Sequence, residues 1–162
     1  MQTRKITVTA LFMAMTIVMC SFSIPVPGGH MYLNDIVIVT AAVLLDPFCA
    51  FMAGGVGAFL GDVFFYPAPM MVSLVTHGLQ SVVISLLSKN RNKRNSIIGT
   101  AIGWIITFTG YTLGRAFIYG TVEYAILKLP FQILQTLVGS VIALILCWKC
   151  GMVNQFDKMM RS

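Results

Sequence analysis

Long apolar runs, interrupted by short polar or proline-containing segments, dominate the pattern of this 162-residue chain. A helix needs about 20 apolar residues to cross the hydrocarbon core of a bilayer, which is about 30 Å thick. The runs predict six helices, at about residues 5–23, 33–45, 47–65, 70–88, 96–118 and 130–148. We therefore predict an all-α fold, an integral membrane bundle of six transmembrane helices that forms a single membrane domain over residues 1–162.

Proline and glycine set most of the predicted boundaries. The first run ends at Ile24–Gly29, which contains two prolines and two glycines that interrupt a helix. Asp46-Pro47 divides the long run between residues 33 and 65, because a residue before proline leaves the helical conformation easily. The second helix is consequently short. Residues 119–129 hold Glu123 and Lys128, and the pattern allows either a loop or a short surface helix there.

Three groups of basic residues give the orientation. They lie before the first predicted helix, between the fourth and fifth, and after the sixth: Arg4 and Lys5; Lys89, Arg91, Lys93 and Arg94; and Lys149, Lys158 and Arg161. Six helices place all three groups on one side, whereas five or seven would split them. The positive-inside rule makes that side cytoplasmic. We therefore expect a multi-pass protein of a bacterial cell membrane with both termini in the cytoplasm.

Composition excludes several classes of function. With 57% hydrophobic and 10% charged residues, a soluble domain of this length could not bury its apolar surface. The net charge of +6 is explained by loops beside anionic lipid, so no nucleic-acid partner is expected. The four cysteines lie in or beside apolar runs and are interpreted as small buried hydrophobes. No metalloprotease, nucleophile-elbow or phosphate-loop motif occurs, so we predict no catalytic residues, no metal, no cofactor and no enzyme activity.

Small residues four positions apart recur in three predicted helices. Such pairs let helix backbones approach closely in lipid. We interpret three of them as packing contacts inside the bundle: Gly57 and Gly61, Gly99 and Gly103, and Gly110 and Gly114. Ala10 and Ala14 in the first helix have two interpretations, packing inside the bundle or a docking face for another membrane subunit.

Scattered polar residues meet in one layer when this topology is imposed. They lie near the non-cytoplasmic ends of the helices and in the loop after the first helix: His30, Tyr32, Asp35, Asp62, His77, Tyr111, Arg115 and Gln135. Charges in lipid are costly and therefore need a purpose. One interpretation is an ion pair between Arg115 and Asp35 or Asp62 that fastens helices together. The other is a ligand pocket that uses these groups as donors, acceptors and stacking surfaces.

Three short segments carry a family resemblance. In order and spacing, Tyr32–Asp35, Gly54–Asp62 and Thr76–Gln80 look like the signatures of the second, third and fourth helices of S components of energy-coupling factor (ECF) vitamin transporters. The Ala10/Ala14 pair and the loop rich in proline and glycine also fit. The chain resembles the subgroup first described as riboflavin-type, which includes proteins for hydroxymethylpyrimidine and pyridoxine.

The resemblance implies a high-affinity substrate-binding subunit of an ATP-driven vitamin importer. Such a subunit captures its vitamin beneath a lid, here Pro27–Tyr32, and joins a membrane scaffold subunit and two ATPase subunits. The Ala10/Ala14 face would meet the scaffold. The few charges favour a small aromatic vitamin or precursor, hydroxymethylpyrimidine or pyridoxine, over dianionic folate, with riboflavin as an alternative. A stand-alone transporter or channel is the competing hypothesis, which the lack of an internal repeat disfavours.

Overall fold

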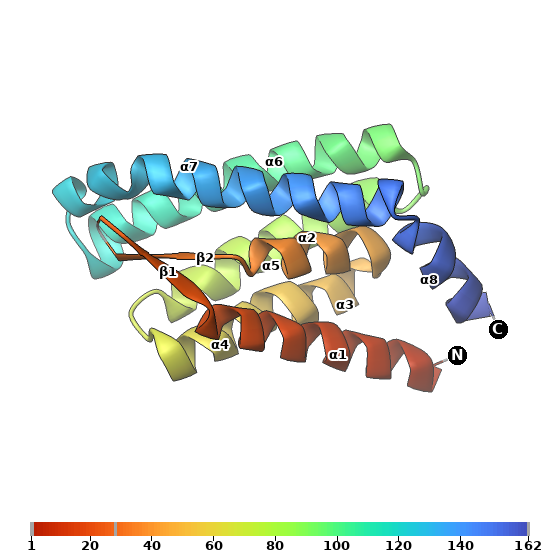
Figure 1. The fold of residues 1–162 in the computed structure, drawn as a ribbon. Helices are drawn as coiled ribbons and strands as arrows, with labels where there is room; N and C mark the ends of the chain where they lie inside the picture. The colour runs from red at the N-terminus through yellow and green to blue at the C-terminus, as the bar shows by residue number, and fades with distance from the viewer. Residues whose placement is uncertain (1, 28, 162) are drawn as a thin grey trace.

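A computed structural model describes residues 2–27 and 29–161, and it consists of a bundle of helices with one short β-hairpin (Figure 1). Five helical stretches within the described residues are long and apolar enough to cross a membrane. They are α1 (Gln2–Ser21), α3–η1–α4 (Pro47–Phe51, Met52–Val56 and Gly57–Phe65), α5 (Met70–Ser88), α6–η2 (Lys93–Gly114 and Arg115–Tyr119) and α7–η3 (Val122–Leu144 and Ile145–Lys149), where η denotes a π-helical segment. The remaining elements are β1 (Ser23–Val26), β2 (Gly29–Tyr32), α2 (Asp35–Leu44) and α8 (Met152–Arg161).

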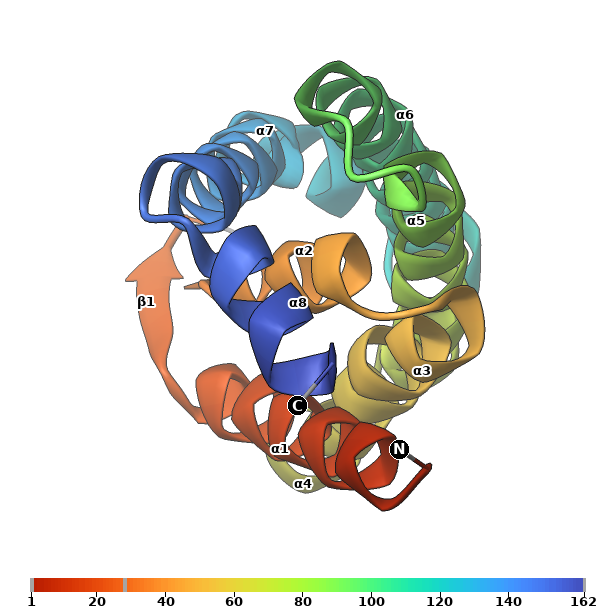
Figure 2. The same cartoon turned by 90° about the vertical axis from the view of Figure 1, so that its right-hand side faces the viewer.

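The short helix α2 occupies the centre of the bundle. Figure 2 shows it surrounded by the longer helices, and it contacts α1, α3, α5 and α7. Nine of its ten residues are buried. Ten residues make a helix of about 15 Å, roughly half of the hydrocarbon thickness. The predicted six-helix bundle is therefore confirmed, with five full-length helices around one helix of half length.

One end of the bundle is closed around the last residues of α2. Arg91 donates from Nη1 to the Val43 carbonyl at 2.6 Å and from Nη2 to the Leu44 carbonyl at 3.0 Å. Ser85 Oγ donates to the Leu45 carbonyl at 2.6 Å. The last carbonyls of a helix have no partner within it, and such groups are costly in lipid. Ser85 in α5 and Arg91 in the loop before α6 therefore donate the hydrogen bonds that these carbonyls cannot obtain within α2.

Helix α8 covers the same end. Figures 1 and 2 place it across the end of the bundle, next to the chain termini. Arg91 Nη2 lies 3.0 Å from Asp157 Oδ1 of α8, and the Arg91 guanidinium lies 5.8 Å from the ring centroid of Phe156. We call this the basic end, because it carries both termini and the loop between α5 and α6. The end that carries the hairpin is called the pocket end.

Small residues set the spacing between helices. Gly57 and Gly61 pack against Thr16 and Cys20 of α1, and a Cβ at Gly61 would lie 2.6 Å from Cys20 Sγ. Gly139 is equally tight, since its Cβ would lie 2.6 Å from Cβ of Asp35. The remaining predicted pairs also contact neighbouring helices: Gly99, Gly103, Gly110 and Gly114. The prediction of intramolecular packing is confirmed for these glycines.

The predicted start of the last long helix, at residue 130, is wrong. Helix α7 begins at Val122 and passes through Pro130 without ending, so 122–129 is neither a loop nor a separate helix. The Thr121 side chain accepts a hydrogen bond from the Tyr124 amide and so caps the first turn, which Glu123 also favours through the helix dipole. The strands and α8 were also not anticipated from the sequence.

Replacing Arg91 tests whether the end of α2 depends on its guanidinium. Arg91→Met should lower the free energy of unfolding by about 2 kcal/mol, because two backbone carbonyls and Asp157 lose a charged donor. Arg94→Met is the matched control, since Arg94 is exposed and carries the same charge. Thermal unfolding in detergent measures both. Equal stability of the two variants would show that the bonds to α2 contribute little.

Candidate functional site

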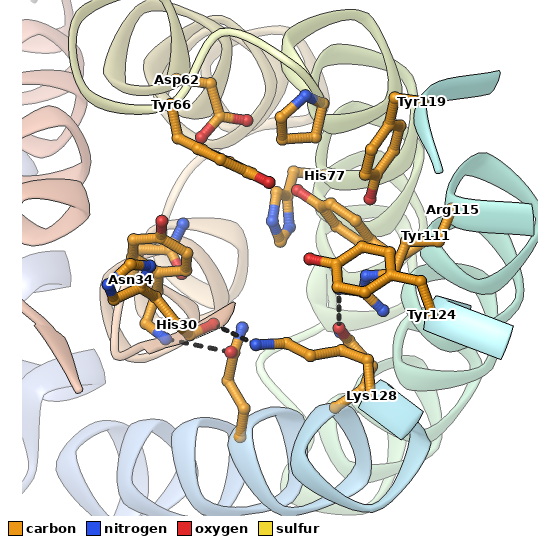
Figure 3. Close-up of a pocket in the computed structure, with 14 residues that line it drawn as sticks. His30, Asn34, Asp62, Tyr66, His77, Tyr111, Arg115, Tyr119, Tyr124 and Lys128 are labelled. Carbon is orange, nitrogen blue, oxygen red and sulfur yellow. Dashed lines mark hydrogen bonds between the residues drawn. The ribbon is translucent and has the colours of Figure 1, made fainter. Parts of the chain in front are cut away.

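A cavity of about 50 Å³ lies at the pocket end, between the hairpin, the beginning of α2 and the surrounding long helices (Figure 3). All five tyrosines and both histidines of the chain line it: Tyr32, Tyr66, Tyr111, Tyr119, Tyr124, His30 and His77. The other lining residues are Asn34, Asp62, Pro69, Arg115, Lys128, Gln132 and Gln135. The pocket therefore joins flat aromatic surfaces with donors and acceptors of both charge signs.

Seven of the eight residues predicted to bind substrate line this cavity. They come from the hairpin, α4, α5, α6, η2 and α7: His30, Tyr32, Asp62, His77, Tyr111, Arg115 and Gln135. Asp35, the eighth, is fully buried at the first turn of α2 and does not line the cavity. The structure thus brings together residues that are up to about 100 positions apart in the chain, such as Tyr32 and Gln135.

Asp35 acts on the pocket through Gln80. Gln80 Nε2 donates to Asp35 Oδ1 at 3.4 Å, and Gln80 Oε1 lies 2.7 Å from His77 Nδ1. Because an amide oxygen only accepts, His77 donates from Nδ1 in this bond. His77 Nδ1 is also 3.9 Å from Asp35 Oδ1. Asp35 and Gln80 therefore set the orientation and tautomer of a histidine in the pocket wall.

A second relay orients Asp62. Ser73 Oγ donates to Asp62 Oδ2, and the hydroxyls of Ser73 and Tyr111 are 2.5 Å apart. Since the serine proton is used on Asp62, Tyr111 is the donor in the second bond. The Tyr111 ring also packs against His77, with centroids 5.4 Å apart. One carboxylate, one imidazole and one phenol are thus held as a unit on one wall.

Arg115, one helical turn after Tyr111, presents an unused donor. Its Nη2 donates to Gln132 Oε1 at 2.6 Å, and its guanidinium lies 5.4 Å from the centroid of Tyr111. Arg115 is buried, and within the described residues its Nη1 has no hydrogen-bond partner. Those residues also contain no ion pair between Arg115 and Asp35 or Asp62. A buried charged donor without a partner favours an acceptor supplied by a ligand.

The hairpin forms a roof over the cavity and is tied to α7. Strands β1 and β2 pair antiparallel, with Ser23 opposite Tyr32. Lys128 Nζ donates to the His30 carbonyl at 2.5 Å, and the Tyr32 amide donates to Gln135 Oε1 at 3.0 Å (Figure 3). Burial raises the pKa of Tyr32 to about 12, which keeps the phenol neutral. We call these two hydrogen bonds the latch bonds, and both are made by residues of the predicted lid, Pro27–Tyr32. Gly28 of the predicted lid lies outside the described residues.

Seven lining residues were not among those predicted to bind substrate: Asn34, Tyr66, Pro69, Tyr119, Tyr124, Lys128 and Gln132. A signal was present on α7, where Tyr124, Lys128, Gln132 and Gln135 recur at helical spacing and share one face. The wrong helix start at residue 130 hid this stripe. The tyrosines carried a second signal, because each one lies near the end of an apolar run or in the segment that follows it.

The chain is similar to a family model, to a curated protein and to a solved structure. A family model described as "ECF-type riboflavin transporter, S component" matches residues 1–150. A protein of Pyrococcus woesei, described as "Uncharacterized protein in gap 3'region", is 36% identical over 110 residues, which cover 66% of this chain and 74% of that protein. A solved structure described as "Structure and mechanism of the S component of a bacterial ECF transporter" superposes with a TM-score of 0.77 at 17% identity, over 93% of this chain and 97% of that one. At 17% identity, this structural similarity shows that the fold is shared.

Removing the two latch bonds should loosen the hairpin. In Lys128→Met/Gln135→Leu, amide deuterium exchange of residues 23–32 should become about 30-fold faster, because roughly 1 kcal/mol is lost for each of the two bonds. Lys158→Met/Gln155→Leu is the control, with the same substitutions at exposed positions of α8. Exchange that stays as slow as in the control would show that α7 does not hold the roof.

Proposed function

This chain belongs to the family of ECF-type riboflavin transporter S components, and on that premise we propose that it is the high-affinity substrate-binding subunit of an ATP-driven vitamin importer. The observation that carries the proposal is the roofed pocket in which all five tyrosines and both histidines gather. Aromatic walls with a few convergent polar groups suit the binding of a small aromatic molecule. The family consists of transporter components, and the chemistry of this pocket is that of binding.

We further propose that the ligand is a single-ring compound, hydroxymethylpyrimidine or pyridoxine. A free volume of about 50 Å³ holds only a few waters, so even a small ring requires some opening of the roof. A three-ring flavin would have to displace several tyrosines. Arg115 Nη1 would receive a ring acceptor or hydroxyl oxygen. Asp62 and His77 would accept from an amino or hydroxyl group.

The distribution of charge supports an orientation. The basic end carries the loop between α5 and α6 together with both termini, so the positive-inside rule places it in the cytoplasm of the cell. The pocket and its hairpin then face outward, where a vitamin arrives. The hairpin would act as the lid, opening for entry and closing through its bonds with Lys128 and Gln135.

An exposed stripe of small residues supports a docking surface on α1. Ala10 and Ala14 are both exposed, so they do not serve packing inside the bundle. Thr3 and Thr7 continue the stripe at helical spacing and are also exposed. A backbone that is accessible in lipid lets a second helix approach closely. We propose that this stripe meets the membrane scaffold subunit, whose two ATPase partners provide the energy for import.

Binding of candidate vitamins tests the pocket. The purified chain should bind hydroxymethylpyrimidine or pyridoxine tightly in calorimetry, with riboflavin as the comparison ligand. Arg115→Met should weaken binding about 10- to 100-fold, the effect of losing one charged hydrogen bond. Arg94→Met, at the other end, should bind normally. Failure of the wild-type chain to bind any B vitamin or precursor would exclude the proposed function, and tight binding of riboflavin alone would exclude the single-ring ligand.

A bulky side chain in the stripe on α1 tests docking to the scaffold subunit separately from vitamin binding. Ala14→Trp should abolish uptake by the complete importer while vitamin affinity stays within about twofold, because the indole blocks close helix approach far from the pocket. Ile105→Trp, at an exposed position of α6 on the other side of the bundle from α1, should transport normally. Retained transport in Ala14→Trp would remove the docking role. Uptake by the chain alone in liposomes would instead support a stand-alone transporter.

A further inference from the structure

A groove at the basic end lies on the outer surface of the bundle, away from the vitamin pocket. It has a volume of about 630 Å³ and is lined by Lys93, Val141, Leu144, Ile145, Trp148 and Lys149. Five lining residues belong to one stretch of α7–η3, and Lys93 opens α6. The apolar floor therefore runs along a membrane-spanning helix, and both lysines lie where that helix and its neighbour leave the membrane.

The two lysines are not neutralised by the protein. Of the five acidic residues, Asp46 and Asp157 lie near the basic end, and their ion pairs are with Lys5 at 2.8 Å and Arg91 at 3.0 Å. The other three are distant from the groove, in the pocket-end half: Asp35, Asp62 and Glu123. Within the described residues, Lys93 and Lys149 have no acidic side chain within ion-pair distance. The positive end of the α6 helix dipole adds to the charge at Lys93.

The floor of the groove has the depth and exposure of a lipid-facing surface. Val141 is eight residues before Lys149, which corresponds to about 12 Å along the helix axis. Val141 and Ile145 are 48% and 45% exposed. Trp148 lies one residue before Lys149, at the level where indole rings favour the membrane interface. The groove is therefore apolar at the depth of the acyl chains and cationic at the level of the lipid headgroups.

We propose that this groove is a binding site for one anionic phospholipid of the leaflet on the side of the termini. The phosphate is bound between Lys93 and Lys149, and one acyl chain lies along Val141, Leu144 and Ile145. Charge complementarity selects the headgroup, because a zwitterionic lipid brings its own cation to two unpaired ammonium groups. The site is independent of the vitamin pocket and depends only on the chain's lying in a bilayer.

Native mass spectrometry of the full chain tests this site with palmitoyl-oleoyl phosphatidylglycerol. One lipid should bind at about 1:1, and at least 10-fold more weakly when phosphatidylcholine with the same chains replaces it. Lys93→Gln/Lys149→Gln should reduce affinity for phosphatidylglycerol about 25-fold, at about fivefold for each lysine near an anionic headgroup. Lys89→Gln/Lys158→Gln removes the same charge at two exposed lysines outside the groove and should bind like wild type.

Three results would overturn the proposal. Equal losses in the two double variants would mean that phosphatidylglycerol responds to net charge and not to a site. Equal binding of soluble glycerophosphoglycerol, which lacks acyl chains, would mean that the apolar floor contributes nothing. A dimer in the same spectra that disappears in Lys93→Gln/Lys149→Gln, without any bound lipid in the wild type, would assign the groove to a second copy of the chain. Thermal unfolding of each variant confirms that it is folded.

Discussion

The half-length of α2 is the constraint on which the rest of the structure depends. A helix of ten residues at the axis of the bundle fills only about half of the membrane's thickness. The surrounding helices must therefore either collapse or enclose a space above it. Here the long helices are held apart at the pocket end by tyrosine, histidine and glutamine side chains and by the hairpin that covers them. The binding pocket is the volume that α2 leaves free.

Buried polar groups at the two ends of the bundle differ in whether they have hydrogen-bond partners. At the basic end, Arg91 and Ser85 satisfy the last carbonyls, and α8 covers the result. At the pocket end, Nη1 of the buried Arg115 has no hydrogen-bond partner among the described residues. A buried charge without a partner is costly in a membrane, which is why we propose that a ligand supplies one. The two ends therefore differ in whether the protein itself satisfies its buried polar groups.

Helices α6 and α7 connect the two sites that we propose. At the pocket end, η2 after α6 carries Arg115 and α7 carries Gln132. At the basic end, Lys93 of α6 and the last residues of α7–η3 form the groove. Both sites combine an apolar or aromatic surface with cationic side chains that form no ion pair with a carboxylate among the described residues. The surrounding medium differs: the pocket is roofed by the hairpin, whereas the groove faces the lipid. A small aromatic molecule suits the first, and an anionic lipid suits the second.

The amino-acid pattern by itself determined the membrane class, the main apolar helical segments and most of the polar layer, because apolar run length and basic loops report directly on a bilayer. It did not reveal α8 or the hairpin. It placed seven pocket residues correctly in depth, including His77 and Arg115. Only the tertiary structure decided which of them face one another. Asp35 lies beneath the wall rather than in it, Arg115 pairs with Gln132 rather than with an aspartate, and Tyr124 and Lys128 join the site because α7 begins earlier than Pro130 indicates. Depth follows from position along a helix, but the direction of a side chain follows from how that helix is rotated and what packs against it. That rotation is set here by close contacts such as Gly139 against Asp35, which no local pattern reveals.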